Sequence, residues 1–348
     1  MTFFQINDSD ILHNIKTVRD RAGVPVWGVL KYNGYGMGAV HMAELLRESG
    51  ITCFAVANAA EGHVLREAGF TKEEILLLSP QSTETEIITS LRDGLLFSIG
   101  STVYAERITA LARKERCFPK CHIAVDTGMG RFGFLPEQYE EIWKLCSSGE
   151  IAVKGIYSHF AAACSDEKKT RKQFTAFCGL LCRMEDDGLD FGMAHIANSP
   201  GLFRFEDMQL DAVRIGSALV GRVAGTDPLR TGLRKVGVLV AEVCDVRTLP
   251  RGSHVGYGGE ARLFRDSKTA VLSAGRQCGI PGRSRLDRLT GRFQTAVIRD
   301  RRVNIIASGS ASHAIADVTG IDVHPGDPAY IDVNPLRVDT GVERVYEK

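Results

Sequence analysis

The chain has 348 residues, and its 43 basic and 42 acidic side chains give a formal net charge of +1 at pH 7. This length suffices for one large domain or two of moderate size, and the near-neutral balance argues against nucleic acid as a partner. Nine cysteines without a CxxC pair favour a reducing compartment over a disulfide framework or a metal site. No secretion signal precedes the first predicted helix and no apolar run reaches membrane-spanning length, so we expect a cytoplasmic protein without membrane contact.

Short apolar segments alternate with amphipathic ones over the first two thirds of the chain. The apolar segments are typical of strands buried on both faces. We expect such strands at residues 24–30, 52–58, 74–79, 95–99, 120–126, 153–160, 193–198 and 212–219. Eight strands alternating with helices predict an α/β fold with a (β/α)8, TIM-like barrel over residues 1–230. No GxGxxG motif follows the first barrel strand, which argues against a dinucleotide-binding fold.

The pattern changes from about Lys235 onward. Segments such as KVGVLVAEVCDVRTL and FQTAVIRDRRVNIIAS are rich in strand-forming residues, are separated by glycines and have no long helical pattern between them. We therefore predict a mostly β C-terminal domain over residues 231–348, joined to the barrel by a linker near residues 224–232.

The segment VPVWGVLKYNGYGMG, residues 24–38, is the most informative stretch for function. It places Lys31 at the carboxyl end of a buried strand, where barrels of this kind carry their chemistry. Burial disfavours an ammonium, so a partly buried lysine can attack a carbonyl and form a Schiff base. A strand-end lysine taken alone more often reaches solvent, and the glycines then simply make a turn.

The residues from Lys31 to Gly38, KYNGYGMG, resemble the lysine motif of the alanine racemases, a family of fold-type III enzymes that use pyridoxal 5'-phosphate (PLP). A second segment, VDTGMGRFGF at residues 125–134, is nearly identical to the family's VDTGMGRLGF. The resemblance implies a PLP-dependent amino acid racemase with alanine as the default substrate.

The same resemblance implies a cofactor site at the ends of the barrel strands. Lys31 would bind PLP covalently, His159 would lie against the pyridine ring, and Arg214 would donate to the pyridine nitrogen. An arginine there keeps that nitrogen unprotonated and weakens the ring as an electron sink. The phosphate would be held by the side chains of Tyr35 and Ser199 and by the backbone of Gly216 and Ser217. Without the resemblance, His159 would be read as a core histidine.

The remaining implied roles concern substrate and proton transfer. Tyr257, in HVGYGGEARL, would be the second acid/base opposite Lys31, although a tyrosine between glycines can also be a β-turn residue. Because the family supplies this tyrosine from the partner subunit, the resemblance implies a homodimer with shared active sites. Arg131 would orient the substrate carboxylate, and Ala311 would stand where the family uses a methionine amide for the same carboxylate.

Departures from the family cluster around the substrate. Ala124 replaces a lysine that is commonly carbamylated, Cys164 replaces an aspartate of the entrance, and three C-terminal motifs are altered, at residues 275–282, 310–313 and 340–344. Three alternatives therefore stay open: a racemase of serine or a larger amino acid, a decarboxylase of the same fold, and a low-activity regulatory homologue. Tyr257 argues against a decarboxylase, whose second base is usually a cysteine.

Overall fold

The computed structural model describes residues 1–225, 231–282, 284, 287, 290 and 292–348. Contacts between Cα atoms divide the chain into two compact units. One unit is Ser9–Lys235, and the other combines Met1–Asp8 with Val236–Lys348. Of the linker predicted at residues 224–232, residues 226–230 lie outside the described part of the chain.

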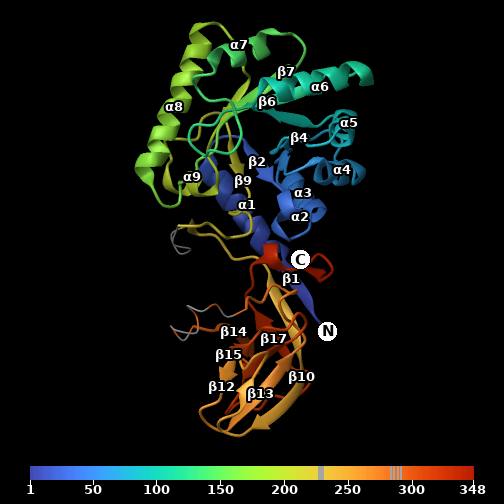
Figure 1. Ribbon diagram of the computed structural model, residues 1–348, viewed down its shortest axis with the longest axis vertical. Coiled ribbons are helices and arrows are strands. Elements are labelled where there is room, and N and C mark those ends of the chain that lie inside the picture. Colours follow the sequence, from blue (N-terminus) through green and yellow to red (C-terminus); the bar gives the residue numbers. More distant parts are fainter. Residues whose placement is uncertain (226–230, 283, 285–286, 288–289, 291) are drawn as a thin grey trace. The chain divides into compact units, whose positions relative to one another are not determined.

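The first unit is a barrel of eight parallel strands surrounded by helices, as predicted (Figure 1). The strands pair in the order β8-β7-β6-β5-β4-β3-β2-β9, and a parallel bridge between His195 and Ala212 joins β8 to β9 and closes the ring. Their bounds are β2 (Val26–Val29), β3 (Cys53–Val56), β4 (Glu74–Leu77), β5 (Leu96–Ile99), β6 (Lys120–Ala124), β7 (Ala152–Tyr157), β8 (Met193–His195) and β9 (Val213–Ile215).

Buried apolar side chains explain why these short segments form the barrel. Trp27, Val29, Ala55, Leu76 and Leu96 are fully or almost fully buried and form a core cluster with Ala212. All four residues of β2 and of β5 are buried, as expected for parallel strands with a core on one side and helices on the other.

The helices of the first unit follow the strands in βα order. Their bounds are α1 (Asp8–Ala22), α2 (Lys31–Tyr35), α3 (Ala39–Glu48), α4 (Ala59–Glu67), α5 (Glu84–Arg92), α6 (Thr102–Glu115), α7 (Tyr139–Ser147), α8 (Glu167–Asp186) and α9 (Ser199–Arg204). Capping residues in the local sequence determine where several of these helices begin. Thr83 and Glu86 form a capping box that satisfies backbone N–H groups at the beginning of α5.

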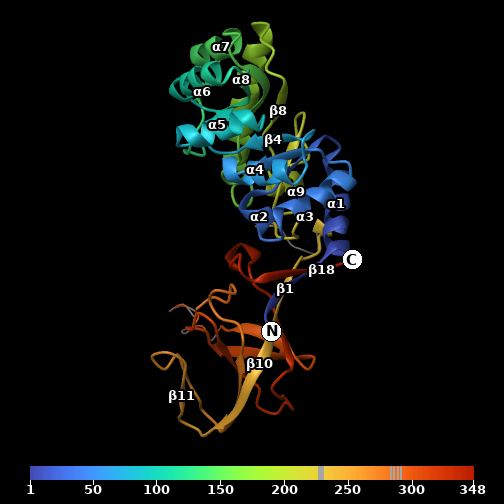
Figure 2. The same cartoon turned by 90° about the vertical axis from the view of Figure 1, so that its right-hand side faces the viewer.

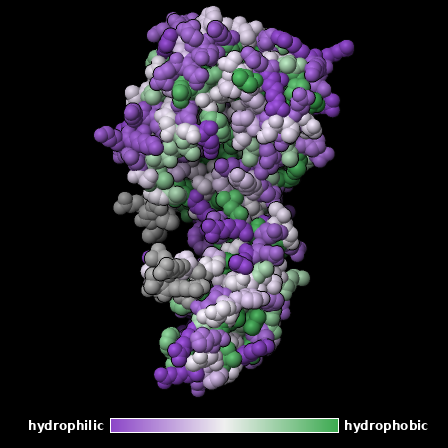
Figure 3. All heavy atoms as spheres, in the orientation of Figure 1, coloured by the Kyte–Doolittle hydropathy of each residue, from purple (hydrophilic) through white to green (hydrophobic). Residues whose placement is uncertain are grey.

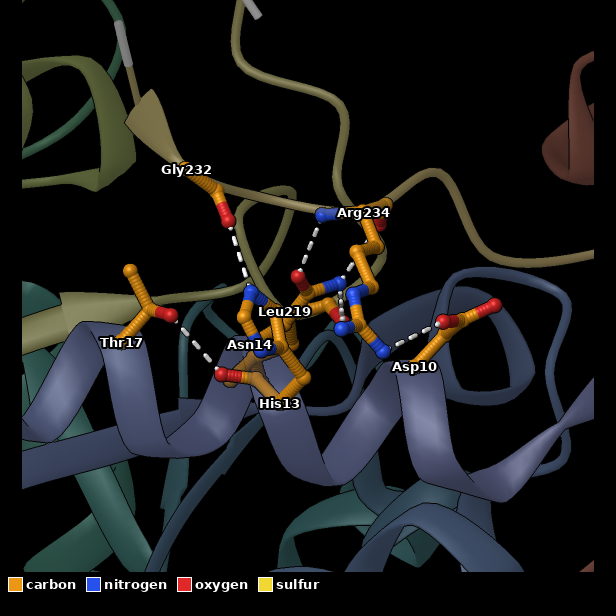
Figure 4. A network of polar contacts seen from close by, with 7 residues as sticks. All are labelled: Asp10, His13, Asn14, Thr17, Leu219, Gly232 and Arg234. Carbon is orange, nitrogen blue, oxygen red and sulfur yellow. Dashed lines mark hydrogen bonds and ion pairs between the residues drawn. The ribbon is translucent and has the colours of Figure 1, made fainter. Parts of the chain in front are cut away.

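A buried asparagine on α1 holds the segment that leaves the barrel (Figure 4). Asn14 is inaccessible to solvent; its Nδ2 donates to the carbonyl oxygens of Leu219 at 3.1 Å and Arg234 at 2.7 Å. Its Oδ1 accepts from the Arg234 N–H at 2.7 Å, and the Arg234 guanidinium lies 3.3 Å from the Asp10 carboxylate. These bonds fix residue 234 against the end of the barrel.

Within the described residues of the second unit, strands pair antiparallel except for β1 with β18. Its main sheet has the order β13-β16-β15-β14-β17-β10-β1-β18, and an extra pairing of β13 with β10 closes six strands into a ring. In Figure 2, β1 lies beside β10 and β18, and it pairs with β18 in parallel. The bounds are β1 (Phe3–Asn7), β10 (Val238–Leu249), β11 (His254–Val255), β12 (Ala261–Arg262), β13 (Ser267–Leu272), β14 (Gln294–Ile298), β15 (Arg301–Ala307), β16 (Ala314–Asp317), β17 (Pro328–Ile331), η1 (Pro335–Arg337) and β18 (Glu343–Glu347).

The surface is mixed in polarity. The face drawn in Figure 3 carries hydrophilic side chains over much of its area, with hydrophobic residues in small separate groups. Among the described residues, no helix is both long and apolar enough to cross a membrane. Within the same residues, no three His, Cys, Asp or Glu side chains are grouped to hold a metal ion.

Candidate active site

A polar cavity of about 240 Å³ lies at the carboxyl ends of the barrel strands. Parallel strands bring the residues that follow them to one end of the barrel, so segments far apart in sequence meet there. The cavity gathers the residues predicted for the barrel: Lys31, Tyr35, Arg131, His159, Ser199, Arg214, Gly216 and Ser217. Its wall also includes Tyr32, Tyr157 and Asn198, which the sequence did not single out.

Lys31 follows β2 and begins an unusual backbone turn. Tyr32, Asn33 and Gly34 have φ angles of 55°, 54° and 62°, so α2 is a left-handed turn rather than an ordinary helix or an open loop. Non-glycine residues in this region cost about 1–2 kcal/mol each. Burial first, and then the positive charge of Arg131, lower the pKa of the Lys31 amine, while Glu61 partly opposes this shift. The amine is therefore easier to deprotonate than an ordinary lysine.

Several hydrogen bonds compensate for the strain of this turn. The Gly34 N–H donates to Leu30 O at 2.7 Å, and Asn33 Oδ1 accepts from the Ala39 N–H at 2.9 Å. Glu61, on α4, accepts from the Tyr32 N–H at 2.6 Å through Oε1 and from the Ala57 N–H at 2.8 Å through Oε2. Glu61 was not a sequence prediction, because its partners are backbone groups that only the folded chain brings near it.

Ser199, Gly216 and Tyr35 form one side of the cavity. Ser199 Oγ accepts weakly from the N–H groups of Gly216 at 3.3 Å and Ala218 at 3.2 Å. The Tyr35 ring lies so close to Gly216 that a Cβ at position 216 would fall 2.4 Å from a ring carbon. Burial raises the pKa of Tyr35 to about 12, so its hydroxyl keeps its proton at neutral pH. Hydroxyl and backbone donors grouped in this way can bind a phosphate.

Arg214 is almost fully buried and is surrounded by acceptors. Its NH1 contacts His195 Nδ1 at 2.7 Å and His195 O at 3.1 Å, and its NH2 donates to Ser158 O at 2.6 Å. NH2 also lies 3.3 Å from Nδ1 of His159. Burial lowers the pKa of Arg214 to about 10, which still leaves the guanidinium charged at neutral pH.

The charge of Arg214 determines the protonation of the two histidines behind it. A guanidinium nitrogen can only donate, so His195 Nδ1 must present a lone pair and the ring proton sits on Nε2. That proton is donated to His122 Nδ1, which lies 2.8 Å away. Burial, reinforced by Arg214, lowers the pKa of His122 to about 3 and that of His195 well below its usual value. In the sequence, the only sign of this row of hydrogen-bonded side chains is that His122 and His195 each stand within an apolar strand.

Asp126 shapes the loop that carries Arg131. Its Oδ1 accepts from the N–H groups of Gly128 and Met129, both at 2.8 Å, and its Oδ2 accepts from the Arg131 N–H at 2.9 Å. Burial would raise the pKa of Asp126, but hydrogen bonds from Gly128 and other backbone groups of the loop outweigh it and lower the pKa overall.

Backbone pairing closes the same loop onto β6. The Phe134 N–H donates to Ala124 O at 2.9 Å, and the Asp126 N–H donates to Phe134 O at 2.8 Å. Ala124, which stands in place of a family lysine, is itself buried. Asp126 and this backbone pairing thus hold the Arg131 loop without a lysine at position 124.

Tyr257 and Ala311 belong to the second unit and are not among the residues that line the Lys31 cavity. Tyr257 is 75% exposed and lines a separate hollow of about 330 Å³ together with Glu260, Ser308, Ser310 and His313. Ala311 is exposed, and its carbonyl oxygen accepts from the Gln277 N–H at 3.1 Å.

Family models match both parts of the chain. The model described as alanine racemase, N-terminal domain, matches residues 6–223, and the model described as alanine racemase, C-terminal domain, matches residues 236–342. The chain belongs to the alanine racemase family.

Individual relatives agree with the family match. An alanine racemase from Desulforamulus reducens is 33% identical over 325 residues, covering 90% of this chain and 85% of the relative. An alanine racemase from Methanococcus maripaludis is 32% identical over 332 residues, covering 93% of this chain and 86% of the relative. The crystal structure of alanine racemase from D-cycloserine-producing Streptomyces lavendulae superposes with a TM-score of 0.90 at 26% identity and covers 100% of this chain and 97% of that one.

As a member of this family, the chain is a PLP-dependent amino acid racemase. The cavity fits the cofactor chemically. It offers the Lys31 amine, whose lowered pKa suits reaction with an aldehyde, hydroxyl and backbone donors that can bind a phosphate, and the buried, charged guanidinium of Arg214. The close approach of Tyr35 to Gly216 leaves no room for a side chain at that position, so the Tyr35 ring can pack directly against the backbone there.

Proposed function

We propose that this racemase interconverts L- and D-alanine, or a closely related small amino acid, with Lys31 and Tyr257 as its two acid/base groups. The observation that supports Lys31 as an acid/base group is its partly buried amine, whose pKa is lowered within a polar cavity. The names of the relatives support alanine as the first substrate to test.

Proton transfer from two opposite faces explains inversion. PLP, when bound, supplies an electron sink that makes the substrate α-proton acidic. Lys31 Nζ takes or returns that proton on one face, and Tyr257 Oη does so on the other. Removal on one face followed by return on the other converts one enantiomer into its mirror image.

The other residues of the cavity have binding roles in this proposal. Tyr35, Ser199 and the backbone of Gly216 and Ser217 hold the phosphate, because they group hydroxyl and N–H donors on one wall. Arg214 would donate to the ring nitrogen and His159 would lie against the ring. For the substrate carboxylate we assign the forked donor of Arg131 and the backbone of Ala311.

The proposal includes a homodimer in the cytoplasm. Tyr257 exposes three quarters of its side chain, which suits a group lent to another subunit. All nine cysteines are free thiols, which suits a reducing compartment.

A panel of single L-amino acids tests the substrate. Purified protein with added PLP is incubated with each amino acid and the products are separated by chiral chromatography. We expect D-alanine to form fastest. Faster formation of D-serine or of a larger D-amino acid would replace alanine as the substrate, and the absence of any D-isomer would refute racemisation.

Two substitutions test the acid/base pair. Lys31→Ala should abolish the visible absorption of bound PLP and the adduct fixed by borohydride, whereas Tyr257→Phe should keep the absorption and lose α-proton removal from one enantiomer only. A borohydride-fixed adduct in Lys31→Ala would mean that another lysine carries the cofactor.

A further inference from the structure

The loop that carries Tyr257 has an unusually permissive backbone. Gly256, Gly258 and Gly259, around the tyrosine, all have positive φ angles, of 82°, 63° and 68°. Glycine has the greatest conformational freedom of any residue in an unfolded or detached loop. An acid/base phenol on such a loop needs a separate contact to hold it in one position.

Glu260 supplies that contact. Its Oε2 accepts from the Ser308 N–H at 3.0 Å and its Oε1 from the Gly309 N–H at 2.8 Å. One carboxylate thus binds two successive backbone donors just after β15 (Arg301–Ala307). Hydrogen bonds to an ionised acceptor are about twice as strong as neutral ones.

The surrounding glycines make room for this bridge. A Cβ at position 309 would lie 2.2 Å from Glu260 Oε1 and 3.7 Å from Tyr257 Cβ. A Cβ at position 256 would lie 2.6 Å from the Ala307 side chain and 3.1 Å from the same Glu260 oxygen. Both loops therefore approach each other around the carboxylate, with Tyr257 beside the contact.

We infer that Glu260 is a positioning residue for Tyr257: by clamping the backbone of Ser308 and Gly309, it holds the glycine-rich loop so that the phenol occupies the place proton transfer requires. This inference rests on the proposed acid/base role of Tyr257. Glu260 itself exchanges no proton with the substrate. Displacement of a reacting group by about 1 Å can reduce a rate by about 100-fold.

Proton exchange measured separately for each enantiomer tests the inference. Wild type, Glu260→Gln, Glu260→Ala and Tyr257→Phe, all loaded with PLP, are given α-deuterated L- or D-alanine, and loss of deuterium to water is followed by mass spectrometry. Tyr257→Phe identifies the enantiomer whose α-deuteron depends on the phenol. We expect Glu260→Ala to slow exchange from that enantiomer by about 10- to 100-fold, and exchange from the other enantiomer by less than about twofold.

A graded response and a matched control separate positioning from a general structural role. Glu260→Gln keeps one acceptor oxygen, so its loss should be smaller than that of Glu260→Ala. Glu347→Gln, an exposed glutamate of β18 in the same unit, should leave both exchange rates unchanged. Amide hydrogen exchange should rise in Glu260→Ala within peptides covering residues 254–263 and 306–313.

The outcomes distinguish the two levels of the proposal. If Glu260→Ala slows α-deuteron exchange equally from both enantiomers, or from neither, the positioning role of Glu260 is wrong. The two-base mechanism still stands in that case if Tyr257→Phe slows exchange from one enantiomer only. If Tyr257→Phe leaves both rates unchanged, the two-base mechanism fails and the positioning role of Glu260 falls with it. Unchanged amide exchange in both peptides also overturns the clamp.

Discussion

Replacement of Asp126 by asparagine removes the charge that organises the Arg131 loop while preserving side-chain shape. The carboxylate accepts three N–H groups, from Gly128, Met129 and Arg131. An asparagine can keep its oxygen toward Gly128 and Met129, but its amide nitrogen then faces the Arg131 N–H, and two donors cannot bond to each other.

The cost follows from counting these bonds. Leaving the partly buried Arg131 N–H without an acceptor costs about 1–3 kcal/mol. Loss of the charge weakens each of the other two bonds by roughly 0.5–1 kcal/mol. We therefore expect Asp126→Asn to lower the free energy of unfolding by about 2–5 kcal/mol, a shift of about 1–2.5 M in the urea midpoint for an m-value of about 2 kcal/mol per M. KM for alanine should rise about tenfold, because Arg131 loses its fixed position.

Urea unfolding followed by circular dichroism and steady-state kinetics measure the two effects. Asp20→Asn is the control, since Asp20 lies on the surface in a pair with Lys16, and such pairs are worth about 0–1 kcal/mol. Because the folded pKa of Asp126 is lowered, its stabilisation is present above the unfolded pKa and is lost as the pH falls through the folded one. A midpoint within about 0.3 M of wild type, with KM unchanged, would refute this account of the loop.

Two further predictions concern the cavity wall and the buried histidines. Gly216→Ala should weaken PLP binding by about 5- to 150-fold, because the new Cβ displaces Tyr35 at an overpacking cost of about 1–3 kcal/mol. Absorbance titration of the apoprotein with PLP measures this affinity. The control is Gly179→Ala, which adds a Cβ in open space on α8 and should leave PLP affinity unchanged. The lowered pKa values of His122 and His159, both about 3, mean that the unfolded chain takes up protons below pH 6.5 before the folded chain does, so stability should fall as the pH drops from 6.5 toward 3. His122→Gln should reduce that slope by up to about 1.4 kcal/mol per pH unit in urea unfolding between pH 4.5 and 6. An unchanged slope would contradict the buried neutral state of His122.

Much of the cavity could be predicted because its residues occupy strand ends. The barrel brings the carboxyl ends of its strands to one edge, so Lys31, Arg131, His159 and Arg214 meet there although they come from different segments. The strands themselves are shorter than predicted. The apolar run at residues 212–219, for example, is extended only over Val213–Ile215, because the chain turns where Gly216 directs its N–H toward Ser199.

The supporting residues were beyond sequence reasoning. Glu61, Asp126 and Glu260 act through backbone N–H groups, which every residue has and which therefore leave no mark in the sequence. The left-handed turn after Lys31 places three non-glycine residues, Tyr32, Asn33 and Tyr35, in a strained region that local preferences disfavour, and contacts with neighbouring loops compensate for it.

By itself the sequence determined the alternation of strands and helices, the change to a β-rich second unit and the chemical identity of the cavity groups, since hydrophobic periodicity and residue type are local properties. The tertiary structure alone decided the protonation of His122 and His195, the lowered pKa of Lys31 and the clamp formed by Glu260. These depend on burial and on distances of a few ångströms between residues remote in the chain, and neither quantity exists until the chain is folded.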